Sequence, residues 1–177
     1  MLVRSSGILL HPSSLPGTYG IGTLGKEAFA FVDLLKKAGQ TWWQILPLGP
    51  TGYGDSPYQC FSSKAGNPYL IDMELLVEKG WLMEADLADA PAFDDAKVMY
   101  GDVIEWKMAL LRKSEEYFLK NENAEFGQFL LANAHWIHDY ALFMALKEKI
   151  QQTAMVRVGG EISQQRMLLL WKRNVLH

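Results

Sequence analysis

Residues able to do chemistry gather between Pro47 and Gln59, directly behind the apolar run 41–46. This segment is rich in Gly and Pro and carries two tyrosines, an aspartate and a serine. Aromatic rings can cover the apolar faces of sugar rings, while a few placed polar groups hydrogen-bond to sugar hydroxyls. Functional groups gather on loops whose ends are held by a rigid scaffold. The segment therefore predicts a sugar-binding loop.

Each candidate residue in or near this loop has a functional and a structural interpretation. Tyr58 is a predicted sugar platform or packs the loop onto the scaffold, and Tyr53, between two glycines, is an exposed platform. Asp55 is expected to organise the loop by bonding nearby backbone amides, rather than to act as a nucleophile. Asn67 precedes Pro68 and marks a turn, although its amide could reach a sugar hydroxyl. His11 lines the cleft or is a hydrogen-bonded structural histidine.

Two other pairs of residues could have a function but are interpreted as structural. His135 and His138 are three residues apart on a predicted helix, but no third metal ligand is evident, so no metal site is predicted. Trp42 and Trp43 should point to opposite faces of a strand and are both expected in the core.

The elements that must position these residues form a βαβ unit. Apolar runs at 7–10 and 41–46 predict strands, and the apolar spacing of 26–37 predicts a helix that Gly39 ends. Both strands lack polar alternation, so burial on both faces is expected. Because the strands should be parallel, the loops 11–25 and 47–68 are expected to meet at one edge of the sheet, where ligands bind in such folds.

The second half of the chain is helical. The pattern predicts a short helix at 73–79 capped by Asp72, an acidic connector, and three longer helices at 101–120, 124–132 and 135–149. The stripe of the first long helix is expected to include Val103, Ile104, Met108, Leu111 and Phe118. One βαβ unit leaves two open sheet edges, and an eight-stranded barrel needs about 250 residues. The chain therefore reads as the front of a larger α/β fold with a helical insertion.

Composition narrows the classes of partner and compartment. The 177 residues are 49% hydrophobic, with a net charge of -3 and no basic stripe, which disfavours nucleic acid as a partner. No apolar run is long enough to cross a bilayer, and no export signal is evident. The one cysteine, Cys60, excludes an internal disulfide. We expect a cytoplasmic protein; the sequence does not indicate its oligomeric state.

Three long motifs resemble the amylomaltases, the 4-α-glucanotransferases of glycoside hydrolase family 77. They are Ser6–Gly17 with Gly20–Gly25, the run from Trp42 to Gln59, and the run from Ala65 to Asp72. Phe61-Ser62, Tyr100–Ile104 and Lys107–Arg112 extend the resemblance, which covers roughly 4–149. Motifs this long and ordered are far more specific than a single glycine motif.

The resemblance implies a (β/α)8 barrel that moves a segment of α-1,4-glucan to glucose or a malto-oligosaccharide, with retention and without a cofactor or metal. It places Ser56 and Tyr58 at the glucan cleft, and Tyr53 with Tyr100 at a second, non-catalytic glucan site. A retaining mechanism needs two carboxyl groups about 5 Å apart. In the family these come from later strands, and no match to their motifs is found, so no catalytic residue is predicted in this chain.

The expected organisation has three parts. Residues 1–72 form the first βαβ unit of the barrel, 73–149 a helical inserted subdomain, and 150–177 a divergent tail that suggests a frameshift or truncation. The predicted function is that of a 4-α-glucanotransferase that binds α-1,4-glucans, with an isolated chain that is inactive. The alternatives are a non-catalytic glucan-binding fragment and a non-functional truncated product.

Overall fold

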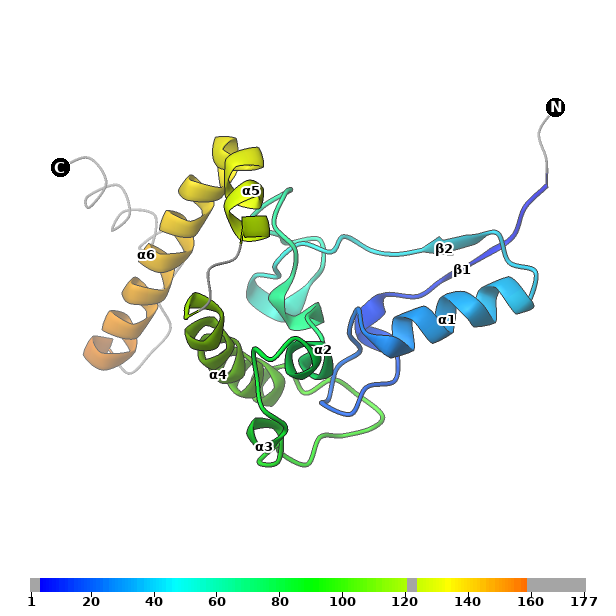
Figure 1. The fold of residues 1–177 in the computed structure, drawn as a ribbon, viewed down its shortest axis with the longest axis horizontal. Coiled ribbons are helices and arrows are strands. Elements are labelled where there is room, and N and C mark those ends of the chain that lie inside the picture. The colour runs from blue at the N-terminus through cyan, green and yellow to red at the C-terminus, as the bar shows by residue number, and fades with distance from the viewer. Residues whose placement is uncertain (1–3, 121–123, 159–177) are drawn as a thin grey trace. The chain divides into compact units, whose positions relative to one another are not determined.

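The computed structural model describes residues 4–120 and 124–158, apart from the side chain of Tyr53 and the side chains of 151–158 (Figure 1). The chain divides into two compact units, residues 1–122 and 123–177. The predicted domain boundaries at 72/73 and 149/150 stay predictions, and the tail beyond Val158 lies outside the described residues.

The first unit begins with the predicted βαβ arrangement. Strand β1 (Gly7–Leu9) pairs in parallel with β2 (Trp42–Gln44), with Ile8 opposite Trp43. Helix α1 (Lys26–Lys37) connects them and runs alongside both strands (Figure 1). The parallel pairing and the helix bounds are confirmed; the strands are shorter than predicted.

Local signals explain where α1 ends. The amide of Ala38 donates to the carbonyl of Leu34, and the amide of Gln40 donates to that of Leu35 at 2.9 Å. Gly39 lies between them with φ at 69°, a left-handed conformation that glycine adopts without strain. The chain can therefore turn back at once into β2.

The expected burial of both strands is wrong for this chain. All three residues of β1 are exposed, and Trp42 in β2 is 64% exposed. Trp43 points the other way, packs edge-on against Phe31 of α1 and donates from its indole nitrogen to the Leu10 carbonyl at 2.8 Å. Within residues 4–120, α1 covers the face of the pair that carries Trp43, and Trp42 on the other face stays exposed. The prediction that both tryptophans are core residues therefore fails for Trp42.

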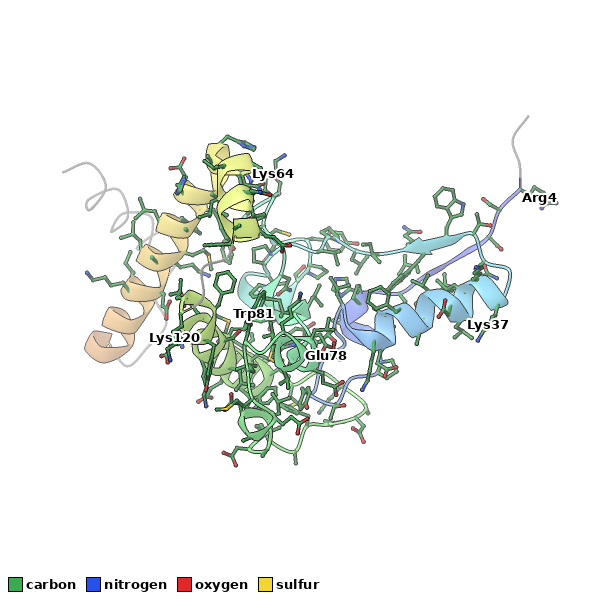
Figure 2. The ribbon with its side chains drawn as sticks, viewed as in Figure 1. Arg4, Lys37, Lys64, Glu78, Trp81 and Lys120 are labelled. Atoms are coloured by element: carbon green, nitrogen blue, oxygen red, sulfur yellow. The ribbon has the colours of Figure 1, made fainter. Side chains whose placement is uncertain are left out.

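The hydrophobic core lies among the next helices: α2 (Met73–Glu78), α3 (Glu84–Leu87) and α4 (Tyr100–Leu119). Its buried members are Met73, Leu76, Leu82 and Leu110. Figure 2 shows side chains crowded between α2 and α4 around Trp81, which packs edge-on against Phe118. Helix α3 was not predicted, because four residues carry too little periodicity to register.

Helix α4 turns a different face to the core from the one that the sequence indicates. Its buried residues are Val103, Lys107, Leu110 and Ser114. Of the predicted stripe only Val103 is fully buried; the rest is half-buried. The apolar pattern misplaced the face because the buried stripe contains a lysine and a serine, which hydrophobic periodicity does not count.

The second unit contains α5 (Ala124–Ala132) and α6 (Ala134–Val158). Asn133 joins them: its side-chain nitrogen donates to the Phe129 carbonyl, and its side-chain oxygen accepts from the Trp136 indole, both at 2.9 Å. The bounds of α5 are as predicted, while α6 begins one residue earlier than expected and extends beyond Lys149.

Candidate functional site

The two loops that follow the strands meet at both ends, as the βαβ prediction requires. His11 lies two residues beyond the end of β1, and its ring interacts with the backbone of Pro47, the first residue of the second loop. At the other end, the Leu24 amide donates to the Leu70 carbonyl at 2.9 Å. Segments distant in sequence are thus held side by side at the carboxyl edge of the strand pair.

The 47–68 loop is closed by its own backbone. The Asn67 amide donates to the Leu48 carbonyl at 2.8 Å, and the Phe61 amide donates to the Pro50 carbonyl at 3.4 Å. Thr51 and Cys60 form an antiparallel bridge beyond these two bonds, toward the tip of the loop. The loop is therefore a defined structure with a base and a tip.

The tip presents the candidate sugar-binding residues. Gly54 and Asp55 both have left-handed backbone angles, with φ at 74° and 54°. The Ser56 hydroxyl accepts from the Tyr58 amide at 3.3 Å, and residue Tyr58 is 71% exposed. Because so exposed a ring packs little of the loop, the geometry favours the platform interpretation of Tyr58 over the packing one.

Asp55 shapes the tip through its backbone. Its amide donates to the Gly52 carbonyl at 3.3 Å. The expected bonds from its carboxylate to nearby backbone amides are not among the hydrogen bonds of the described residues. A non-glycine residue with positive φ is uncommon and often marks a functional turn.

His11 and Asn67 both cap short 3₁₀ turns. The His11 Nδ1 accepts from the Ser13 amide at 3.3 Å and lies 2.7 Å from its hydroxyl oxygen, and the Asn67 Oδ1 accepts from the Tyr69 amide at 2.9 Å. Burial lowers the pKa of His11, and the Pro47 backbone opposes that shift. Its Nε2 is buried without a hydrogen bond of normal geometry in the described chain. These contacts support the structural interpretation of both residues.

The remaining predicted pair is Tyr53 and Tyr100. Tyr53 begins a 3₁₀ turn that includes Asp55, but its side chain lies outside the described part. Tyr100 is the half-buried first residue of α4. Their pairing stays a prediction. Within 4–120, no hydrogen bond or ring contact joins the side chains of His11, Asn67, Tyr58 and Tyr100 to one another.

A buried polar cluster beside the two loops was not predicted. The Thr23 hydroxyl donates to Asp72 Oδ2 at 2.5 Å, while Asp72 Oδ1 accepts from the Leu75 amide at 3.0 Å. Asp72 was expected only to cap α2, which it does. The link to Thr23 could not be found from the sequence, because it joins residues 49 apart.

Lys107 of α4 completes this cluster. Its residue exposure is 0%, and its ammonium donates to the Tyr69 carbonyl at 2.7 Å. Burial lowers the pKa of Lys107 to about 8, although the charge of Asp72 opposes the shift. A lysine on the apolar stripe of α4 was the available signal, since lysine is almost never fully buried without a partner.

An open groove of about 760 Å³ lies beside the first loop. Residues 13–23 form one wall, and the rest of the lining is Lys26, Glu27, Asp72, Glu74 and the segment 94–98. The Lys26 ammonium is paired with Glu74 at 2.7 Å inside this lining. Six of the seven predicted glucan-binding residues have described side chains, and none of these six lines the groove. The exposed tip of the 47–68 loop and this groove are therefore separate features.

The described residues contain neither a candidate membrane span nor a candidate metal site. No helix among them combines the length and apolar character needed to cross a membrane. In 4–120 and 124–158, no three histidine, cysteine or acidic side chains lie close enough to bind a metal ion.

Comparison with known proteins identifies relatives across most of the chain. The family model described as 4-alpha-glucanotransferase, of glycoside hydrolase family 77, matches residues 10–173, which extends past Lys149, where the motif resemblance fades. The 4-alpha-glucanotransferase of Thermus thermophilus is 51% identical over 150 residues, covering 82% of this chain and 29% of the relative. A chloroplastic or amyloplastic 4-alpha-glucanotransferase of Oryza sativa is 39% identical, over 83% of this chain and 26% of its own length.

A solved structure gives the same answer. The amylomaltase of Streptococcus agalactiae, in complex with acarbose, matches with a TM-score of 0.79 and 40% identity, covering 94% of this chain and 35% of that chain. The chain thus spans about a third or less of the relatives that it matches. Since the family model covers well over half of the chain, this protein belongs to the 4-alpha-glucanotransferase family, the amylomaltases.

Proposed function

We propose that this chain forms a glucan-binding part of a 4-alpha-glucanotransferase and does not itself carry the catalytic carboxylates. The observation that supports it best is the exposed Tyr58 ring on a backbone-closed loop, in a chain whose family model is that of a glucanotransferase. The whole enzyme would move a segment of α-1,4-glucan to glucose or a malto-oligosaccharide.

The fold supports a place in a (β/α)8 barrel. The parallel pair β1–β2 is joined through helix α1, which is the strand–helix–strand unit that barrels repeat. The strand face away from α1 carries Leu9 and Trp42, which are 57% and 64% exposed. Further strands of a barrel would cover such a face. The loops 11–25 and 47–68 would then lie at the barrel face where ligands bind.

Binding of α-1,4-glucans is proposed through Tyr58, Ser56 and Asp55 at the loop tip, with Asn67 and His11 holding its base. Tyr53 and Tyr100 are proposed as a second glucan contact, as the family resemblance implies. The solved relative binds acarbose, which agrees with a sugar ligand. We also propose a cytoplasmic location, supported by the single cysteine in the sequence, and no nucleic-acid partner, supported by the net charge of -3.

Calorimetric titration of the purified chain with maltoheptaose tests this function. Tyr58→Ala should weaken binding about tenfold, since truncating an aromatic anchor costs more than ~1 kcal/mol. Tyr58→Phe is the matched control, because it keeps the ring and should retain most of the affinity. Equal affinity in all three proteins would reject the proposed site.

A transfer assay separates binding from catalysis. Maltoheptaose mixed with labelled glucose should give no longer labelled products, since the proposal assigns the catalytic carboxylates elsewhere. Labelled oligosaccharides formed by the purified chain would refute that part. No binding together with a broad, non-cooperative melt would instead support a product that does not function.

A further inference from the structure

The three-residue turn Pro68–Leu70, which ends the 47–68 loop, is fixed from three directions. The Asn67 amide ties its start to Leu48 at the base of the loop, and the Leu70 carbonyl binds the Leu24 amide of the other loop. The Tyr69 carbonyl, in the middle, accepts from the Lys107 ammonium of α4 at 2.7 Å. Lys107 thus attaches the closure of the loop to helix α4.

We propose that Lys107 is a positioning residue for glucan binding: from inside α4 it holds the Tyr69 carbonyl and thereby fixes where the 47–68 loop closes. The inference rests on the proposed function, because it assigns Lys107 a part in the same site. Lys107 itself does not reach the loop tip and touches no substrate.

The buried position of the Lys107 ammonium costs free energy that an apolar side chain would not cost. Burying an ammonium costs free energy unless hydrogen bonds and opposite charges compensate, and an apolar residue of similar size would avoid that cost. Lys107 lies on the same buried face of α4 as Val103 and Leu110, where methionine or leucine would pack without penalty. A charged donor at this place indicates a role that packing alone does not supply.

The charges around Lys107 come from neighbouring elements. Asp72, which caps α2, is the acidic group that interacts with it. Asp72 in turn accepts a hydrogen bond from the Thr23 hydroxyl. Burial raises the pKa of Tyr19, the charges of Glu74 and Asp72 raise it further, and the charge of Lys26 opposes this shift. Tyr19 stacks on Trp106, the residue next to Lys107. Because burial lowers the pKa of Lys107 to about 8, the bond to Tyr69 changes from charge-assisted to neutral in mildly alkaline solution.

Lys107→Met in the full chain tests the inference, because methionine is an unbranched side chain only one heavy atom shorter than lysine and cannot donate a hydrogen bond. Amide exchange, corrected for intrinsic rates, should accelerate about tenfold at Phe61 and Asn67, as expected for losing a charge-assisted hydrogen bond. The maltoheptaose dissociation constant should rise by a similar factor. Lys113→Met is the control: it lies on the same helix, with its ammonium at the surface paired to Asp86.

A pH profile distinguishes positioning from packing. Maltoheptaose affinity of the wild type should fall as pH rises through about 8, and the Lys107→Met profile should lack this step. Unchanged exchange at Phe61 and Asn67 in Lys107→Met would overturn the inference even if glucan binding persists. If the wild type binds no glucan, the proposed function fails, and the exchange experiment still decides whether Lys107 fixes the loop.

Should Lys107→Met fail to fold, ¹³C-lysine labelling of the wild type provides the second measurement. One lysine signal should titrate near pH 8, with amide exchange at Asn67 accelerating over the same range. The inference would be contradicted if the lysine titration and the change in exchange at Asn67 had different midpoints, or if no lysine titrated below pH 9.5.

Discussion

Thr23 and Asp72 are joined by a 2.5 Å hydrogen bond from the hydroxyl of one to the carboxylate of the other, across 49 residues of sequence. The same carboxylate accepts from the Leu75 amide and starts α2. One side chain therefore begins a helix and also holds the first loop against it. The site depends on this cluster because the cluster attaches both loops to the core.

Asp72→Ala should lower the free energy of unfolding of the first unit by about 2 kcal/mol or more, since it removes a helix cap and leaves a buried hydroxyl unpaired. Urea unfolding followed by tryptophan fluorescence measures this. Asp33→Ala, on the exposed side of α1, is the control and should be neutral or slightly stabilising. An equal loss of unfolding free energy in both variants would show that the cluster does not stabilise the protein.

Gly25→Ala should destabilise the same unit by about 1–3 kcal/mol, the usual cost of overpacking. A Cβ atom at Gly25 would overlap the Asp72 carboxylate, which cannot move without losing Thr23 or Leu75. Gly101→Ala offers the matched control, because a Cβ there meets nothing within 4 Å. Thermal melts of the two variants should shift in opposite directions; a stable Gly25→Ala protein would contradict the described geometry.

Lys107 should make the protein more stable as pH rises. Its pKa of about 8 in the folded state lies below its ordinary 10.5, so between these values the unfolded chain binds more protons. Stability should then increase with pH by up to about 1.4 kcal/mol per unit from this group. Urea unfolding from pH 7 to 10.5 measures the free energy of unfolding of the wild type and of Lys107→Met. The difference between the two proteins gives the contribution of Lys107 at each pH. A difference that does not vary with pH would disprove the shifted pKa.

Trp42→Ser should reduce the binding of a hydrophobic dye without lowering stability appreciably. Residue Trp42 is 64% exposed on the strand face away from α1, although its indole nitrogen donates to the Ser5 hydroxyl at 3.1 Å. Exposed apolar surface beside an open strand edge promotes association. Trp43→Ser is the comparison: it should destabilise, because that ring packs on Phe31. The reverse order of the two effects would contradict the assigned faces.

The features that the sequence predicts well are those set by neighbouring residues. The bounds of α1, the stop at Gly39 and the Asp72 cap each depend on side chains within a few positions. The meeting of the two loops also followed, since parallel pairing dictates it. Lys107 and the Thr23–Asp72 bond escaped prediction because their partners are distant in sequence. Trp42 was misassigned because an apolar strand does not reveal whether this chain covers both of its faces.

The most direct test of the account is to map maltoheptaose binding onto the ¹H–¹⁵N spectrum of the chain. Amide signals should shift at residues 54–60, around Tyr58, and at the loop closure 67–69, with smaller changes elsewhere. If shifts are instead confined to the groove walls 13–23 and 94–98, or if the spectrum does not change at saturating sugar, the 47–68 loop is not the glucan site.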